Sequence, residues 1–148
     1  MHVLTLATDY AIRSMIYLAD RTGFVTAREI SAAMSIPKSY AAQVLHALLK
    51  AGLVTTKKGQ VGGYATARPA SQVTVMDVMN VMDNGVRINR CLEDDHYCSR
   101  QATGYCVMHR VYRQVQDKVE ETFRGLTLAD LLKMQEEVLR EAAGPQQG

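Results

Sequence analysis

The chain has 148 residues, which suits one domain of ordinary size or a small domain with an appendage. Its hydrophobic content of 47% is enough for a core and excludes global disorder. No N-terminal secretion signal precedes the first predicted helix, and no apolar run approaches the roughly 18 residues of a membrane span. The odd number of cysteines, three, argues against a secreted disulfide scaffold. We therefore expect a cytoplasmic protein.

The net charge of +2 is unevenly distributed along the chain. Residues 1–70 carry eight basic and three acidic residues, a net charge of +5. Residues 71–148 carry nine basic and twelve acidic residues, a net charge of −3. A basic N-terminal half followed by an acidic C-terminal half is typical of a nucleic-acid-binding module joined to another part.

The first predicted helix spans residues 8–20. Asp9 falls in its first turn, where a carboxylate favours the positive end of the helix dipole, and this is the ordinary explanation of Asp9. Apolar side chains recurring at steps of three and four predict the buried stripe of this helix, namely Ile12, Met15, Ile16 and Ala19.

A helix-turn-helix is predicted next. The sequence from Thr26 to Glu29 has the form of a capping box that opens a short second helix. A turn follows at Ile36-Pro37, because the residue before proline is pushed out of the helical region. The third helix covers residues 38–51 and ends at Gly52. The apolar face of the second helix is expected to consist of Ile30, Ala33 and Met34.

The third helix divides into an apolar and a polar face. Ala41, Val44, Leu45 and Leu48 are expected to face inward. The opposite stripe contains Gln43, whose amide can pair with adenine, while lysines at either end of the helix can contact phosphate. For this helix taken alone, an ordinary solvated face explains the stripe equally well. The stripe consists of Ser39, Gln43, His46 and Lys50.

A β-wing is predicted after the third helix. Residues 53–58 and 64–68 have the composition of two strands, and the glycine-rich segment 59–63 joins them. Lysines enter the turn, as expected for a wing tip that lies against the DNA backbone or minor groove. The fold class is therefore mostly α, a winged helix-turn-helix with a small β-wing. The DNA contacts are expected at Lys38, Ser39, Tyr40, Gln43, His46, Lys50, Lys57, Lys58 and Gln60.

The three cysteines lie in or beside a segment without periodicity, residues 84–105, which follows a short helix capped at Thr74. A connection of this length in a compact domain is usually functional. Cys91, Cys98 and Cys106 lie close together in sequence, and His109 follows three positions after the last of them. In the cytoplasm such a group indicates a metal or redox site rather than a structural disulfide.

A long amphipathic helix is predicted after Cys106. Its apolar stripe needs a partner surface, and a two-fold homodimer is the commonest solution. A last short helix is capped by Thr127–Asp130 and reaches Glu141. We expect a DNA-binding domain at 1–83, a sensor loop at 84–105, dimerisation and C-terminal helices at 106–142, and a disordered tail at 143–148. The stripe of the long helix consists of Met108, Tyr112, Val115, Val119, Phe123 and Leu126.

The chain resembles the Rrf-two family of winged-helix transcription regulators, which includes IscR-like and NsrR-like iron–sulfur sensors. The wing and the three-cysteine loop together make the resemblance specific. It extends over nearly the whole chain, and besides the three cysteines it rests on the segments Thr8–Ala11, Ile36–Leu45, Gly52–Val54, Lys58–Tyr64 and Leu126–Leu131.

The resemblance implies a homodimer on a pseudo-palindromic operator, with an iron–sulfur cluster held by the three cysteines of each chain. IscR-like members use a histidine as fourth ligand, and His109 matches it with a 2Fe–2S cluster. NsrR-like members use an aspartate from the partner subunit, and Asp9 matches it with a 4Fe–4S cluster. His96, inside the loop, is a third candidate.

Two features depart from the family pattern. The cysteines are separated by six and seven residues, against the five and five typical of IscR-like members, which leaves the cluster type open. Lys58 stands in the wing where relatives often carry arginine, so minor-groove reading is expected to be weaker there.

The main alternative is a thiol–disulfide or zinc-binding regulator, since three cysteines and His109 also suit a zinc site. An enzyme is not expected, because the sequence shows no paired-carboxylate signature, activated nucleophile or nucleotide-binding loop.

Overall fold

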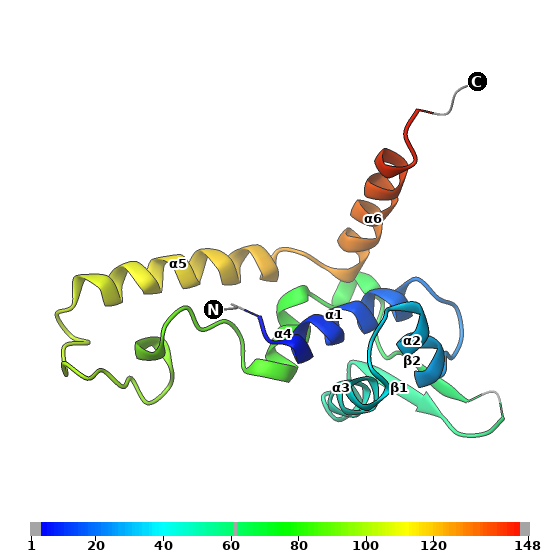
Figure 1. Ribbon diagram of the computed structural model, residues 1–148, viewed down its shortest axis with the longest axis horizontal. Helices are drawn as coiled ribbons and strands as arrows, with labels where there is room; N and C mark the ends of the chain where they lie inside the picture. Colours follow the sequence, from blue (N-terminus) through cyan, green and yellow to red (C-terminus); the bar gives the residue numbers. More distant parts are fainter. Residues whose placement is uncertain (1–3, 61, 146–148) are drawn as a thin grey trace.

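The computed structural model describes residues 4–60 and 62–145. The described residues form six α-helices, two short 3₁₀ turns and one two-stranded antiparallel sheet, so the predicted winged-helix class is confirmed. Figure 1 shows a body built around α1 to α4 and the wing, from which α5 and the loop before it extend as an arm. The elements are α1 (Leu6–Ala19), α2 (Ala27–Ala33), α3 (Lys38–Lys50), β1 (Val54–Lys57), β2 (Gly63–Thr66), η1 (Ala70–Gln72), α4 (Val75–Asp83), η2 (Arg90–Leu92), α5 (Val107–Arg124) and α6 (Leu128–Ala142).

Local capping explains where several helices begin and end. The Thr5 hydroxyl accepts from the N–H of Thr8, so α1 begins two residues earlier than predicted. A Schellman motif ends α3. Gly52 has the left-handed φ of +76°, its backbone N–H donates to the Leu49 carbonyl, and the N–H of Leu53 donates to the Leu48 carbonyl. At α2 the structure shows one of the two capping-box bonds, from Glu29 N to the Thr26 hydroxyl.

The main core joins α1, α3 and the wing. Ala41, Val44, Leu45 and Leu48 are buried as predicted. In α1 the predicted stripe is confirmed in part. Met15 is fully buried, and Ile12 and Ala19 are partly buried against the core. The prediction omitted Ala11 and Leu18, which are buried beside Met15. Ala33 of α2 is exposed, contrary to prediction, whereas the predicted Ile30 is buried and Met34 packs against the core.

A smaller second core connects α4 to α5, and it divides the predicted stripe of α5 in two. Val119 and Phe123 pack on the buried residues Val75, Met79 and Val86 of the same chain. In the N-terminal half of the stripe, Met108 and Val115 are exposed, whereas Tyr112 is half-buried. Leu126 packs in the second core but lies beyond the end of α5.

The C-terminal helix α6 has 15 residues and is opened by a full capping box between Thr127 and Asp130, as predicted. It ends at Ala142, one residue beyond the predicted end. Of the predicted disordered tail, residues 146–148 lie outside the described part of the chain. Among the described helices, none is long and apolar enough to span a membrane.

The wing is anchored to the body by backbone pairing. Strands β1 and β2 pair from Val54 with Thr66 to Lys57 with Gly63. Tyr64 also exchanges two backbone hydrogen bonds with Val25, at 2.7 and 2.8 Å. At Gly63 a Cβ atom would lie 2.4 Å from the Val25 carbonyl oxygen, so this close approach requires glycine. Residue 61 of the predicted turn lies outside the described residues.

Candidate functional site

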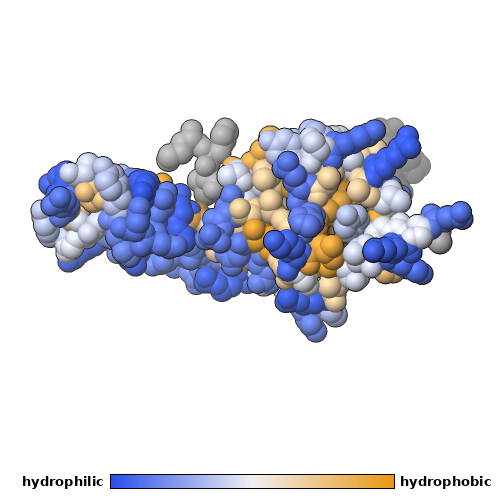
Figure 2. Space-filling model, turned by 90° about the horizontal axis from the view of Figure 1, so that it is seen from below, coloured by the Kyte–Doolittle hydropathy of each residue, from blue (hydrophilic) through white to orange (hydrophobic). Residues whose placement is uncertain are grey.

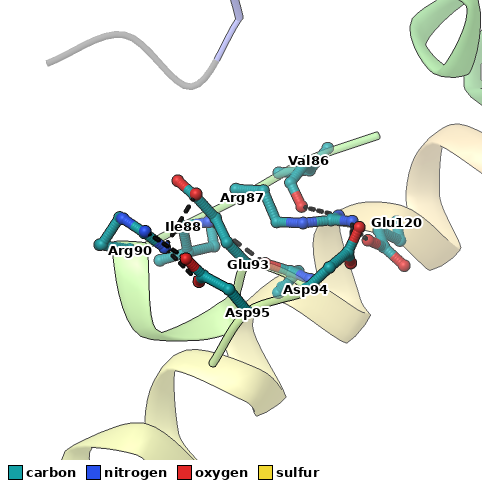
Figure 3. Close-up of polar contacts among 9 residues, drawn as sticks. Val86, Arg87, Ile88, Arg90, Glu93, Asp94, Asp95 and Glu120 are labelled. Atoms are coloured by element: carbon teal, nitrogen blue, oxygen red, sulfur yellow. Dashed lines mark hydrogen bonds and ion pairs between the residues drawn. The ribbon is translucent and has the colours of Figure 1, made fainter. Parts of the chain in front are cut away.

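The loop before α5 is held against that helix by polar contacts, although its sequence lacks periodicity. The backbone N–H of Ile88 donates to the Gln116 side chain at 3.2 Å. Arg87 lies between Asp94, at 3.5 Å, and Glu120 of α5, at 3.9 Å, as Figure 3 shows. Ala102, further along the loop, is fully buried. These contacts hold the loop in a defined position against α5.

A bidentate ion pair between Arg90 and Asp95 spans the turn that follows the first cysteine. The Arg90 guanidinium donates to both oxygens of Asp95, each at 2.5 Å, and also contacts Glu93 at 3.0 Å (Figure 3). The hydrogen bond from Arg90, assisted by the backbone N–H of Tyr97, lowers the pKa of Asp95 to about 2. The pair therefore stays ionised at all ordinary pH values.

The three cysteines face one pocket. Cys91, Cys98 and Cys106 are half-buried free thiols and line a cavity of about 240 Å³. The cavity lies between the loop and the first turns of α5. His96 is exposed, with its backbone in a left-handed turn at φ +49°. The described residues lining the pocket are Asn89, Arg90, Cys91, Tyr97, Cys98, Ser99, Cys106 and Tyr112.

His109 lies behind Cys91 rather than in the wall of this cavity. It is 8% exposed, and its Nδ1 atom is 3.4 Å from the Cys91 Sγ atom. Its Nε2 atom is 3.4 Å from an Nη2 atom of Arg113, one helical turn further along α5. The sequence prediction named His109 but missed Arg113, which the four-residue spacing on a helix would have indicated.

Asp9 lies apart from the thiols of its own chain, on α1. Its carboxylate forms an ion pair with Arg13 at 2.7 Å and is about half exposed. Arg13 also donates to the Met34 carbonyl at 3.2 Å, in the turn that precedes the helix α3. Asp9 is thus joined to the helix-turn-helix through Arg13.

A structural zinc ion needs four donor atoms about 2.0–2.3 Å from one point. Within residues 4–60 and 62–145, no three His, Cys, Asp or Glu side chains form a group that could hold a single metal ion. The ligands of an iron–sulfur cluster are shared among more than one iron atom, so its thiolates need not converge on one point. Three thiols lining one cavity therefore have the donor chemistry of an iron–sulfur group.

The turn after Cys98 stabilises its thiolate. Backbone N–H groups of Ala102 and Arg100 are the main causes, and they lower the pKa of the Cys98 thiol. In metal-free protein we expect iodoacetamide to modify Cys98 at lower pH than it modifies a free cysteine peptide. Peptide mass spectrometry across a pH series measures this. The urea-unfolded protein, in which the turn is lost, is the control, and an identical pH profile in both states would contradict the assignment.

The predicted DNA-reading residues form one exposed surface. Ser39, Gln43, His46 and Lys50 are all exposed along α3, and Lys38 lies at its first position. Tyr40 is partly exposed but its ring packs edge-on against Tyr10 of α1, with centroids 5.2 Å apart. The wing residues Lys57, Lys58 and Gln60 are exposed as well.

Arg28 joins this surface, although the sequence prediction omitted it. Arg28, Ala27 and Lys38 line a cavity of about 380 Å³ between the starts of α2 and α3. In helix-turn-helix proteins the first helix crosses the DNA backbone, so two cations at this place are suited to a phosphate. The sequence signal that could have identified Arg28 is a basic residue in the first turn of the helix before α3.

Figure 2 shows that the arm is mainly hydrophilic on the face seen from below, whereas hydrophobic residues gather over the body.

Comparison with known proteins identifies the group to which this fold and loop belong. The model of the Rrf2 family, described as an iron-dependent transcriptional regulator, matches residues 4–134. The chain belongs to the Rrf2 family. Its resemblance to this family, drawn from sequence motifs, is therefore confirmed, and its relatives are transcription regulators rather than enzymes.

Individual Rrf2 relatives extend the comparison. The transcriptional regulator IscR of Enterobacter sp. (strain 638) is 31% identical over 146 residues, covering 97% of this chain and 86% of the relative. Among solved structures, T. potens IscR matches with a TM-score of 0.74 and 28% identity, covering 98% of this chain and 93% of that one. CymR, the global cysteine regulator of B. subtilis, has the same fold, with a TM-score of 0.74 and 24% identity over 90% of this chain and 98% of its own.

Proposed function

We propose that this Rrf2 protein is a homodimeric, cytoplasmic transcription regulator that senses redox state, nitric oxide or iron–sulfur supply through an iron–sulfur cluster. The observation that carries the proposal is the single cavity lined by the side chains of Cys91, Cys98 and Cys106. Similarity to IscR over nearly the whole chain supports the same cofactor. The fourth ligand is His109 of the same chain or Asp9 of a second copy.

The DNA-binding role rests on the exposed face of α3 and on the wing. Gln43 is placed to read a base edge in the major groove, and Lys38 and Arg28 are placed to contact the backbone. In a two-fold dimer two such helices address the halves of a pseudo-palindromic operator.

A second copy of the chain is the proposed partner of α5. The N-terminal half of this helix exposes a row of large apolar side chains, and monomeric proteins seldom expose such a row. A groove of about 520 Å³ beside Val115 and Val119 continues it. A twin helix from a second copy fits this surface by the self-complementarity of two-fold interfaces. The exposed row consists of Val107, Met108, Val111 and Val115.

Contacts between the end of α4 and the start of α1 support coupling of the cofactor to DNA binding. The carboxylate of Asp83, the last residue of α4 before the loop, accepts hydrogen bonds from the hydroxyls of Thr5, at 2.8 Å, and Thr8. A bound cluster would join the three thiolates to one another. Oxidants, nitric oxide or iron shortage would remove the cluster and with it this link. With the thiolates joined, the loop holds α1 and, through Arg13, the turn before α3 in one position. Loss of the link frees that position and changes the spacing of the recognition helices.

Purification without air tests this function. We expect iron and inorganic sulfide in the wild-type protein, visible absorbance, and a change in operator affinity when the cofactor is removed. Cys98→Ala is expected to abolish the absorbance and to bind the operator as the metal-free protein does. Ser99→Ala, which alters a hydroxyl in the same cavity, is the matched control and should keep iron, sulfide and colour.

The alternatives give different results in the same experiment. Stoichiometric zinc without colour would replace the proposal with a zinc-binding regulator. Metal-free protein whose operator affinity responds to thiol oxidants would indicate a thiol–disulfide regulator. Equal operator binding by the loaded wild-type, metal-free and Cys98→Ala proteins would refute the coupling.

A further inference from the structure

We propose that Tyr97 is a gate at the mouth of the cysteine cavity, held in place by the ion pair between Arg90 and Asp95, and that it admits small molecules to the thiols faster than bulky ones. This inference rests on the proposed function for its consequence, because it concerns what reaches the cofactor. The gate itself is a property of the chain and can be measured on the thiols alone.

Tyr97 borders both the cavity and the solvent. It lines the pocket of about 240 Å³ together with the three cysteines. The residue is nevertheless 57% exposed, so much of it lies at the protein surface. The thiols themselves are only half-buried, so a reagent reaches them from outside through an opening. A residue that borders the cavity and solvent at once lies at that opening, and its ring determines the width of the passage.

Two contacts fix Tyr97 to the ion pair. The guanidinium carbon of Arg90, which lines the same cavity, is 5.2 Å from the centre of the Tyr97 ring, within the range of a cation–π interaction. The backbone N–H of Tyr97 donates to Asp95 Oδ1 at 3.2 Å. The ring is therefore held by the cation and the backbone by the anion of one ion pair.

The ion pair is suited to this task although it is exposed. Single ion pairs between exposed side chains contribute little, because both charges are solvated and both side chains are mobile. Arg90 and Asp95 differ from such pairs, because two parallel hydrogen bonds of 2.5 Å fix the orientation of both groups (Figure 3). Glu93 contacts the same guanidinium at 3.0 Å. Arg90 therefore offers a fixed surface to the Tyr97 ring.

The gate separates molecules by size rather than by reactivity. A small molecule passes beside the ring, whereas a bulky one enters only when the ring leaves the guanidinium of Arg90. The loss of a cation–π contact at an exposed site slows such entry by about two- to fivefold. For the proposed sensor, the gate favours small signals such as nitric oxide or dioxygen over removal of iron by bulky chelating molecules.

The first experiment uses reduced, metal-free protein and two maleimides that share one reactive group. N-methylmaleimide is small and pyrene maleimide is bulky, and all three cysteines of the chain line the cavity, so no other thiol reacts. Peptide mass spectrometry gives the initial labelling rate of each cysteine. The ratio of the bulky to the small rate is compared, because a change in thiol reactivity alters both rates alike. We expect Tyr97→Ala to raise this ratio by about two- to fivefold.

Three further variants identify the cause. Tyr97→Phe keeps the ring and should keep the wild-type ratio. Tyr105→Ala is the matched control, because Tyr105 is a 74% exposed tyrosine of the same loop and is not among the described residues that line the cavity. It should also keep the wild-type ratio. Asp95→Asn weakens the hydrogen bonds from Arg90 and should raise the ratio part of the way toward that of Tyr97→Ala.

The results that overturn the proposal are specific. Equal ratios in the wild type and Tyr97→Ala would show that Tyr97 is not a gate. An equal rise in Tyr105→Ala would assign the effect to a general loosening of the loop and would likewise refute the gate. An unchanged ratio in Asp95→Asn would refute the positioning role of the ion pair.

The second experiment uses protein loaded without air and measures the loss of visible absorbance. Tyr97→Ala should lose colour faster than the wild type with bathophenanthroline, a bulky iron chelator, and at the wild-type rate with dissolved nitric oxide. Equal rates for the two proteins with the chelator would contradict the gate. Wild-type protein without iron and sulfide would refute the proposed function instead. The labelling ratios of the metal-free protein would then still decide whether Tyr97 controls access to the thiols.

Discussion

Replacing Val115 with glutamate is expected to turn the protein into a monomer and to reduce affinity for a full operator by roughly 10²- to 10⁴-fold. Val115 is 44% exposed in the single chain, so the substitution should leave the fold intact. In the proposed dimer the carboxylate would lie against apolar side chains without a partner, which is costly. Each monomer then binds a half-site alone and loses the gain from joining two half-sites.

Sedimentation velocity and binding to full and half operators measure both effects. Arg110→Glu is the control, because it changes the charge of α5 by a larger amount on the side away from the apolar row. It should remain dimeric. If Val115→Glu also stays dimeric and binds the full operator normally, the exposed row of α5 is not the dimer interface.

The fold was largely readable from the sequence where one local signal dominates. The inner face of α3 was predicted correctly because four apolar residues recur on one side and Gly52 ends the helix. Helix α1 was harder, because it has apolar residues on more than one side. Its burial is decided by packing: Ala11 and Leu18 are in the main core, while Ile12 lies between the two cores.

The long helix shows why a periodic stripe does not determine its partner. The sequence predicted one continuous apolar stripe and one dimer surface. In the structure the C-terminal half of that stripe, with Val119 and Phe123, is used by the chain itself. This division depends on where α4 docks, which no pattern within α5 encodes. Only the N-terminal half remains for a second subunit.

The sequence predicted which residues form the cysteine site, but not what each of them contacts. Spacing placed three thiols and His109 together, and the structure brings all three thiols to one cavity. The ring of His109 contacts Cys91 through one nitrogen and Arg113 through the other, neighbours that the spacing of the cysteines does not reveal. Likewise, the sequence offered Asp9 as a ligand, but its present partner, Arg13, is visible only once α1 is folded. Residue type and spacing therefore identify donors, while hydrogen-bond partners assign what each donor does.

Gln43→Ala is expected to lose operator affinity twice in each dimer, once at each half-site. A well-placed base contact contributes about 1–3 kcal/mol of discrimination, so the dimer should lose roughly 30-fold to more than 1000-fold. The side chain of Gln43 is exposed on the outer face of α3, so the substitution should leave the fold intact. Affinity for random DNA should change little, because base reading does not contribute there.

Lys38→Ala is the matched comparison, since it removes a phosphate contact from the same helix. It should weaken operator and random DNA alike and reduce the slope of log affinity against log salt by about 1 for each subunit. Fluorescence anisotropy over a salt series with both DNAs separates the two variants. Equal losses on operator and random DNA for Gln43→Ala would show that Gln43 does not read bases. An unchanged salt slope for Lys38→Ala would remove Lys38 from the phosphate-contacting surface.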